Sequence, residues 1–417
     1  MTPLTTEETT LQSQAVSSSR NTACPSLSTG GRLASVDIFR GLNVLLMIFV
    51  NNLAEVKGLP WWTYHRGDVD GMTYVDMVFP GFLFLMGMAI PLSIDARAAR
   101  GEGKARIWTH IIARSLSLLV LGLFIANAPN VSERYTHISQ TWWTTLGFIG
   151  IAMIWVRFPA EENRPMLARV LRYGGLGMLA VLFVVFRRVT PDGQIATLDF
   201  SYWEILGLLG WAYLLVSTIY LLFAKRFRVL AAAFALMVAL NAFSIIGWFD
   251  WITWPDYWNP FEAGLASLTM AGVLASFVLA GNTLALTFQR KLEWLVASAA
   301  GLFAVGFALQ PLGISKNRDT PAWCLYCTAA NVLLVLLLYW IADVKGWRAW
   351  AKFAKSAGEN PLLAYFLPFI PLLLLPLHGL TTFGTAGSWG VYKSALLTAL
   401  ALVVTDVLVR LKVKLRL

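Results

Sequence analysis

The residues best suited to chemistry in this sequence lie close together between positions 65 and 76. A histidine and three carboxylates stand there beside two hydrophobic runs, in a chain that has only four histidines and 13% charged residues; they are His65, Asp68, Asp70 and Asp76. Imidazole exchanges protons near neutral pH, so His65 is the candidate general base. Asp70 and Asp76 are candidates for orienting the imidazole or binding a cationic substrate, and the alternative is that they cap the following helix.

Tryptophans crowd the same region and a later loop. The candidates for substrate binding are Trp61, Trp62, Trp254 and Trp258, together with Asp68. Tryptophans in such loops are typical of an aromatic belt at a membrane surface. They also fit a sugar-binding platform, because indole faces stack on the apolar face of a pyranose. Both interpretations stay open.

The composition indicates a membrane protein. The chain has 417 residues, 57% of them hydrophobic, and a mean hydropathy of +0.63, which is too apolar for a soluble protein of this size. The net charge is +10, but Lys and Arg lie mainly in short loops between apolar runs, where they orient helices. We therefore expect membrane lipid rather than nucleic acid as the partner. The cysteines support neither a disulfide framework nor a zinc site, and no metal is expected.

Apolar runs long enough to cross about 30 Å of hydrocarbon recur from residue 37 onward. Because backbone amides in lipid must be paired within their own segment or in a closed barrel, and strand-like alternation is missing, these runs are predicted to be helices. The sequence predicts an all-α polytopic integral membrane protein with about 12 (10–12) transmembrane helices. They lie near 37–54, 73–94, 108–128, 141–158, 166–186, 203–224, 228–248, 263–287, 291–311, 321–343, 361–377 and 391–410.

The loops between these runs alternate between rich and poor in Lys and Arg. By the positive-inside rule this alternation places both termini in the cytoplasm and His65 on the opposite side. Residues 1–32 are rich in Ser and Thr and lack the apolar core of a signal peptide, so they are predicted to be a disordered cytoplasmic tail. Residues 33–417 are predicted to form a single transmembrane domain.

Several motifs in the first two spans resemble the heparan-alpha-glucosaminide N-acetyltransferase family. They begin with SVDIFRGL at 35–42 and LMIFVN at 46–51, and continue with His65, Asp70-Gly71, Thr73, Asp76 and VFP at 78–80. Weaker matches are Lys316-Asn317 and Asn360-Pro361-Leu362 with Tyr365. The large luminal N-terminal domain of the animal enzyme is missing, so the chain looks like a bacterial-type relative. It departs from the family in a longer gap between Asn51 and His65 and in Asp70, where Asn is frequent.

The resemblance implies that acetyl moves from cytoplasmic acetyl-CoA to an amino sugar, glucosamine or a terminal glucosaminide, on the far side of a bacterial inner membrane. It implies that His65 and Asn51 carry the chemistry, and homodimerisation is a family-level expectation. His65 would act as the base, or would attack the thioester to form an acetyl-imidazole. Asn51 would donate to the thioester oxygen.

Coenzyme A would need cations for its phosphates. Arg40 pairs with Asp37 three residues earlier on one helix face, and a basic loop follows the second span; the candidates are Arg40, Asp37, Arg97, Arg100 and Lys104. Asn317 and Asn360 are candidate polar groups of the same site. Glycine-rich phosphate loops are missing from the sequence, so side chains and helix ends would hold the cofactor.

The alternative function is a secondary transporter of an amino sugar or a related small solute. An even number of helices with both ends in the cytoplasm is also a common transporter plan. However, the two halves of the chain show no similarity, and polar residues gather at the ends of the first two spans rather than at mid-membrane. The sequence therefore favours the acetyltransferase.

Overall fold

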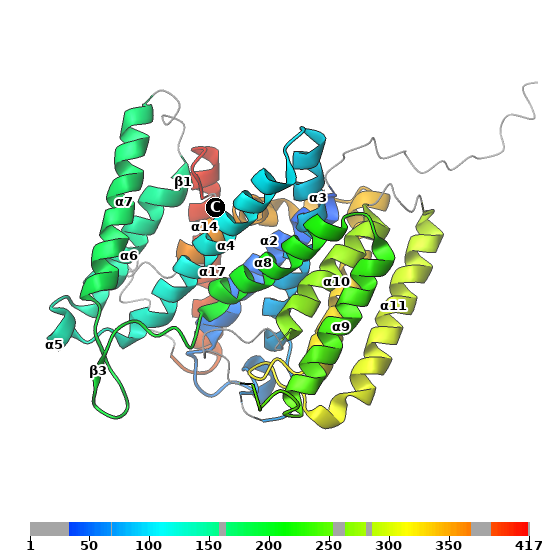
Figure 1. Cartoon of the computed structure of the whole chain (residues 1–417), viewed down its shortest axis with the longest axis horizontal. Coiled ribbons are helices and arrows are strands. Elements are labelled where there is room, and N and C mark those ends of the chain that lie inside the picture. The colour runs from blue at the N-terminus through cyan, green and yellow to red at the C-terminus, as the bar shows by residue number, and fades with distance from the viewer. Residues whose placement is uncertain are drawn as a thin grey trace, which may run out of the picture. The chain divides into compact units, whose positions relative to one another are not determined.

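The structure is a computed structural model that describes residues 33–67, 69–157, 164–252, 263–280, 286–367 and 385–415 (Figure 1). Its α-helices are α2 (Ala34–Leu53), α3 (Val78–Ala99), α4 (Lys104–Asn127), α5 (Glu133–Thr136), α6 (Gln140–Trp155), α7 (Pro165–Val185), α8 (Glu204–Phe223), α9 (Phe227–Ile245), α10 (Gly264–Leu279), α11 (Phe288–Ala308), α12 (Pro321–Tyr339), α13 (Lys355–Glu359), α14 (Pro361–Phe366) and α17 (Gly387–Arg410).

Shorter elements connect these helices. The 3-10 helices are η1 (Trp61–Thr63), η2 (Val75–Met77), η3 (Ala128–Asn130), η5 (Gln310–Leu312) and η7 (Ala349–Ala354), and η6 (Trp340–Val344) is a π-helical turn. Two antiparallel pairs of two-residue strands join β1 (Val156–Arg157) to β4 (Lys414–Leu415) and β2 (Arg188–Val189) to β3 (Ile195–Ala196).

Within the described residues, nine helices are long and apolar enough to cross a membrane. The shorter α6 and α10 lie where two further runs were expected. The predicted class, an all-α polytopic integral membrane protein, is confirmed. The predicted number of spans stays a prediction, because the run at 361–377 lies partly outside the described residues. The tail at 1–32 lies outside them as well, and the cytoplasmic position of the termini also stays a prediction.

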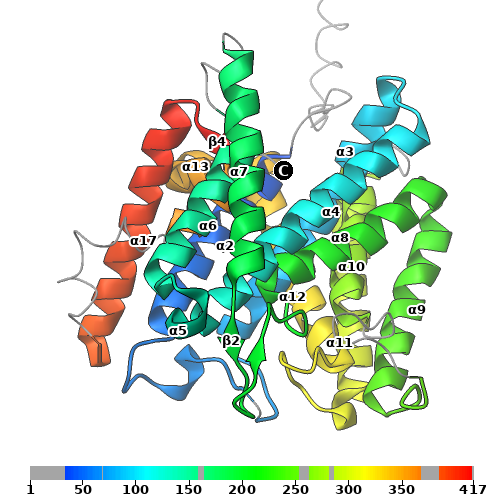
Figure 2. The same ribbon diagram turned by 60° about the vertical axis from the view of Figure 1, so that its left-hand side comes forward.

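The helices pack in pairs, with α4 along α8, α3 along α10, α11 along α12 and α6 along α7 (Figures 1 and 2). Small residues allow the closest of these approaches. A methyl group added at Gly87 on α3 would overlap the carbonyl oxygen of Thr269 on α10, and one at Gly272 would overlap that of Phe84. Such close backbone contacts are a main source of helix association in membranes, where burial of apolar surface contributes little.

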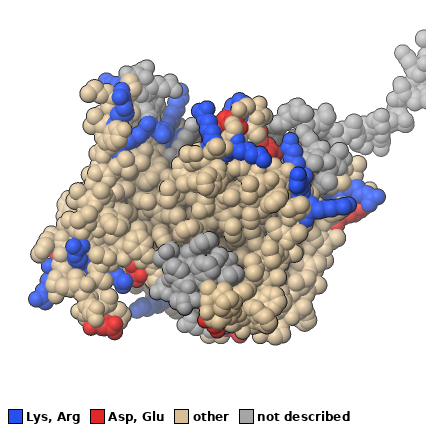
Figure 3. Space-filling view, viewed as in Figure 1, with Lys and Arg blue, Asp and Glu red and all other residues tan. Residues whose placement is uncertain are grey.

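Charged side chains on the face seen in Figure 3 lie mainly along its edges. Figure 3 shows Lys and Arg mainly along the upper edge, with a smaller group at the lower left and a broad uncharged surface between. Helices α7, α9 and α11 leave many large apolar side chains exposed on such surfaces, among them Val184, Leu236 and Phe307. This distribution fits a bilayer that covers the uncharged band and leaves the charged ends in water.

Two loops far apart in sequence meet beside α2 and α3. The first connects α2 to α3 and contains η1, and the second connects α11 to α12 and contains η5. The amide of Gly71 donates to the carbonyl of Ile314 at 2.8 Å, and Asp70 pairs with Arg318 at 2.8 Å. Gly71 has φ of 135°, a conformation that side chains disfavour, so glycine permits this junction. The junction brings the two loops together around His65.

Candidate active site

His65 and Asp76 form a hydrogen-bonded pair at the start of α3. Nδ1 of His65 lies 2.6 Å from Oδ1 of Asp76, whose side chain is only 2% exposed, whereas that of His65 is 37% exposed. The carboxylate therefore accepts the Nδ1 proton, which leaves Nε2 with its lone pair on the more accessible side of the ring. A histidine in this tautomer, held by a buried carboxylate, is arranged to accept a proton or to attack a carbonyl carbon.

The second oxygen of Asp76 holds the turn that precedes α3. Oδ2 accepts from the amide of Thr73 at 2.9 Å, and the hydroxyl of Thr73 donates to the carbonyl of Tyr64 at 2.9 Å. The bond from the Thr73 amide to the acidic side chain three positions later is one half of a capping box, whereas the Thr73 hydroxyl accepts from the amide of Val75 at 3.3 Å. One oxygen of Asp76 thus holds the imidazole, and the other holds the turn before α3.

Lys316 reaches the same imidazole from the other loop. Its Nζ lies 3.5 Å from Nε2 of His65. Burial lowers the pKa of Lys316, and the carboxylates of Asp76, Asp319 and Glu204 oppose that shift. In the sequence, Lys316 is only part of a weak motif and has no predicted role, because 251 residues separate it from His65.

Glu204 belongs to the same group of charged residues as His65, Asp76 and Lys316. It too was not among the predicted site residues. It opens α8 with a φ of 55°, an uncommon conformation for a residue with a side chain, and its carboxylate accepts from the hydroxyl of Tyr365 at 3.3 Å and from the amide of Leu206 at 3.3 Å. Its charge acts on Lys316. Strained backbone often accompanies functional sites. In the sequence, Glu204 looks like an ordinary acidic residue at a helix start.

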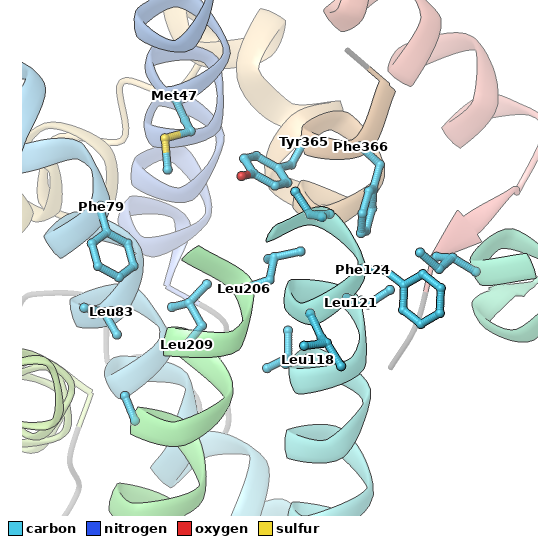
Figure 4. Packing of buried hydrophobic residues seen from close by; sticks show 14 of the residues in the cluster. Met47, Phe79, Leu83, Leu118, Leu121, Phe124, Leu206, Leu209, Tyr365 and Phe366 are labelled. Atoms are coloured by element: carbon cyan, nitrogen blue, oxygen red, sulfur yellow. The ribbon is translucent and has the colours of Figure 1, made fainter. Parts of the chain in front are cut away.

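A cavity of about 370 Å³ opens among α2, α3, α4, α8 and α14. Figure 4 shows part of its apolar surroundings, including Met47, Leu118, Leu206, Leu209 and Tyr365. Its lining is Arg40, Met47, Phe82, Leu85, Met86, Ala89, Arg114, Leu118, Ile205, Leu206, Leu209, Pro361, Leu362 and Tyr365. The cavity therefore combines two guanidinium groups with a long apolar wall, and it includes the tyrosine that bonds to Glu204.

The two arginines of the cavity are held in different ways. Arg40 pairs with Asp37 at 3.2 Å, the contact expected from their spacing, and also donates to the carbonyl of Gly358 at 3.4 Å. Arg114 stacks over the ring of Tyr213 at 4.8 Å, and its buried Nε has no hydrogen-bond partner within the described part of the chain. Arg114 was not among the predicted site residues, because an arginine inside an apolar run carries no motif.

The other predicted cofactor residues do not line this cavity. Arg97 and Arg100 both pair with Glu102, at 2.9 and 3.0 Å, and Lys104 is exposed at the start of α4. Asn360, which is 2% exposed, donates to Val413 and accepts from Leu415, so it holds the segment after α17. Asn317 is exposed beside Lys316. Their cofactor roles stay predictions.

The remaining predicted residues are placed only in part. Trp61 and Trp62 are 65% and 51% exposed, and the guanidinium of Arg66 lies over the Trp61 ring at 5.1 Å. Asn51 lies near the end of α2 and makes no hydrogen bond to His65 within the described residues. Asp70 faces Arg318 in an exposed ion pair rather than the imidazole. Asp68, Trp254 and Trp258 lie outside the described residues.

Comparisons with known proteins reach the same region. A family model described as "Domain of unknown function (DUF5009)" matches residues 32–254. The chain is 40% identical over 103 residues to a mouse protein (Mus musculus) named heparan-alpha-glucosaminide N-acetyltransferase, and 41% identical over 99 residues to the human protein (Homo sapiens) of that name. These matches cover 25% and 24% of this chain, and the chain spans only 15% and 14% of the two relatives.

Proposed function

We propose that this chain, which belongs to the DUF5009 family, is a multi-pass membrane acyltransferase that moves acetyl from acetyl-CoA to the amino group of an amino sugar. One observation carries the proposal. A buried carboxylate holds Nδ1 of His65 at 2.6 Å, so that Nε2 is left as the reactive nitrogen beside the ammonium of Lys316. Partial similarity to two N-acetyltransferases supports the choice of reaction.

The cavity fits the cofactor arm that such a reaction needs. Its apolar wall suits the extended pantetheine chain, and its two guanidinium groups, Arg40 and Arg114, suit phosphate oxygens. A volume of about 370 Å³ is at the small end for a ligand site, so the nucleotide of coenzyme A would remain outside it. Tyr365 lines the cavity and bonds to Glu204, whose charge acts on Lys316, so these residues connect the cavity to the groups around His65.

Two routes of transfer remain consistent with this geometry. In the direct route the acceptor amine attacks the acetyl carbonyl, Nε2 of His65 takes the amine proton, and the C–S bond breaks to release the thiolate. In the covalent route Nε2 attacks first and the thiolate leaves. The amine then attacks the acetyl carbon, the bond from that carbon to Nε2 breaks, and the released Nε2 takes the amine proton. Both routes need an unprotonated Nε2, and in the neutral imidazole the hydrogen bond from Nδ1 to Asp76 leaves Nε2 as that nitrogen.

The acceptor would bind at the loop surface that carries His65. The exposed ring of Trp62 and the ring of Trp61 with Arg66 stacked on it lie on this loop. An amino sugar offers an apolar ring face for stacking and a cationic nitrogen for the nearby carboxylates. The proposal places this surface on the extracytoplasmic side of a bacterial inner membrane, with acetyl-CoA entering from the cytoplasm.

The test is acetyl transfer from radiolabelled acetyl-CoA to glucosamine by the purified full chain in detergent. The decisive variant is His65→Asn, and His137→Asn is its matched control, because His137 is exposed at φ of 59°, a conformation that Asn tolerates. We expect labelled N-acetylglucosamine from the wild type and from His137→Asn, and none above background from His65→Asn. Lack of transfer by the wild type, with uptake of labelled glucosamine into proteoliposomes, would instead identify a transporter.

A further inference from the structure

We propose that Lys316 is a catalytic residue whose ammonium group stabilises the negative charge that develops on the acetyl oxygen during transfer. This inference rests on the proposed acyltransferase function and goes beyond it, because it assigns the group that faces the reacting carbonyl. It starts from position: Nζ of Lys316 lies 3.5 Å from Nε2 of His65, the nitrogen at which chemistry would occur.

The two groups can act on one carbonyl that lies beside them, because a separation of 3.5 Å is too short for a carbonyl to lie between them. Reacting atoms in a near-attack arrangement lie about 3–3.5 Å apart, so a carbonyl carbon at that distance from Nε2 brings its oxygen within reach of Nζ. An ammonium has three N–H donors, and one can point to the carbonyl oxygen while another remains near the imidazole. Oxyanion stabilisation requires such a donor to be in place before the reaction.

The loop that carries Lys316 is held firmly on both sides. The amide of Ser315 donates to the hydroxyl of Thr320 at 2.9 Å, and the amide of Asp319 donates to the carbonyl of Lys316 at 3.2 Å. On the other side Ile314 accepts from the amide of Gly71, in the loop that carries His65. These bonds set the position of the ammonium relative to the imidazole and reduce the reorganisation needed during catalysis.

The charges around Lys316 favour its cationic form. The groups that face it are Asp76 from the start of α3, Asp319 from its own loop, Glu204 from α8 and the imidazole of His65. The carboxylates counteract burial, which lowers the pKa of Lys316. The two arginines of these loops make other contacts, since Arg66 stacks on Trp61 and Arg318 pairs with Asp70. Within the described residues, Lys316 is thus the cation in contact with Nε2.

The step that Lys316 assists balances without a proton from lysine. The attacking nitrogen forms a bond to the carbonyl carbon, and the π electrons of the C=O bond move to oxygen, where they face the ammonium. The oxyanion then collapses, the C–S bond breaks, and the thiolate leaves with the electron pair. In the direct route the proton of the amine goes to Nε2 of His65. Lys316 keeps its protons and supplies only charge and a hydrogen bond.

The experiment compares Lys316→Met, Lys316→Arg and the control Lys355→Met, which removes an exposed lysine of the pair with Glu359. Loss of one oxyanion donor lowers kcat by about 10²–10³-fold, and we expect this for Lys316→Met. Acetyl-CoA affinity, measured by calorimetry, should change less than about threefold, because Lys316 acts on the transition state. The control should keep wild-type kcat and affinity.

The second variant provides a readout that a purely structural role would not change. If protonated Lys316 is required, kcat of the wild type falls as the pH rises through the lowered pKa of Lys316. In Lys316→Arg this alkaline decline should disappear, because guanidinium stays protonated up to a pH of about 12. The comparison of wild type with Lys316→Arg still tests the proposal if Lys316→Met does not fold.

The outcomes separate the two proposals. A wild type that transfers acetyl, together with a Lys316→Met variant within about threefold of its kcat, overturns the role of Lys316 and leaves the acyltransferase in place. An alkaline decline that is the same in wild type and Lys316→Arg also overturns it. A wild type that transfers no acetyl to any amine overturns the acyltransferase, and this inference with it.

Discussion

Replacing Asp76 by Asn tests whether the buried carboxylate sets the tautomer of His65. Asn is nearly isosteric with Asp, so it can occupy the same space, but one of its two polar atoms is now a donor. Asp76 uses both oxygens as acceptors, Oδ1 toward Nδ1 of His65 at 2.6 Å and Oδ2 toward the amide of Thr73 at 2.9 Å. The amide side chain of Asn can satisfy only one of these donors at a time.

The two orientations of the Asn side chain have different costs. If its oxygen accepts from Thr73, its NH₂ group faces Nδ1 of His65, the ring proton moves to Nε2, and the reactive lone pair is lost. If its oxygen faces Nδ1, the NH₂ group meets the amide of Thr73, and a buried donor left unsatisfied costs about 1–3 kcal/mol. A cost of about 1.4 kcal/mol changes an equilibrium constant tenfold. The cost of the second orientation alone therefore reduces the population with an active imidazole by roughly 5- to 150-fold.

The lost charge adds to this effect. An Asp-to-Asn change beside the catalytic histidine of a Ser-His-Asp triad lowers kcat by about 10⁴. For Asp76→Asn we therefore expect a fall in kcat of about 10²–10⁴, with acetyl-CoA affinity almost unchanged because Asp76 does not line the cavity. The assay is steady-state transfer of radiolabelled acetyl, with calorimetry for affinity and thermal unfolding to confirm the fold.

The matched control is Asp70→Asn on the same loop. Asp70 is 66% exposed and pairs with Arg318, which is 54% exposed, and such surface pairs contribute about 0–1 kcal/mol. We expect kcat to change less than about fivefold, since the structure turns this carboxylate away from the imidazole. A folded Asp76→Asn variant within about tenfold of wild-type kcat, or one no worse than Asp70→Asn, would refute the reasoning.

Four further changes test the cofactor site, the group proposed to hold the thioester oxygen, and the charges around Lys316. Arg114→Met should weaken acetyl-CoA binding by about 10- to 100-fold, as should Arg40→Met, because a hydrogen bond to a charged group contributes about 1.5–3 kcal/mol; calorimetry checks both. Asn51→Ala should lower kcat more than it raises KM if the amide holds the thioester oxygen, and a pure KM effect contradicts this role. Glu204→Gln removes a carboxylate that raises the pKa of Lys316, so the alkaline decline of kcat should move to lower pH, and an unchanged pH profile contradicts it.

Local sequence patterns were sufficient for the class of the protein and for the centre of the site. A run of about 20 apolar residues can satisfy its backbone in lipid only as a helix, so each span is decided within its own segment. The pairing of Asp37 with Arg40 follows from a spacing of three on one helix. The proximity of His65 and Asp76 is likewise local, since 11 residues separate them.

Other features of the site depend on which helices are neighbours. The sequence leaves both Asp70 and Asp76 as candidates to orient the imidazole, and the structure separates them by burying Asp76 beside His65 and pairing Asp70 with Arg318. In the sequence, Arg114 is an isolated charge in an apolar run. In the structure, it lines a cavity together with residues of α2, α3, α8 and α14. The exact number of spans and the roles of the predicted site residues stay predictions.

The sequence by itself determined that this is an all-helical membrane protein. It also determined that the residues best suited to proton transfer follow the first span. Only the tertiary structure brought Lys316 to His65 across 251 residues, and Glu204 to Tyr365 across 161. The physical reason is that hydropathy specifies a span within its own segment, whereas the choice of neighbours depends on shape. That choice rests on close contacts such as those of Gly87 and Gly272, which a single sequence does not reveal.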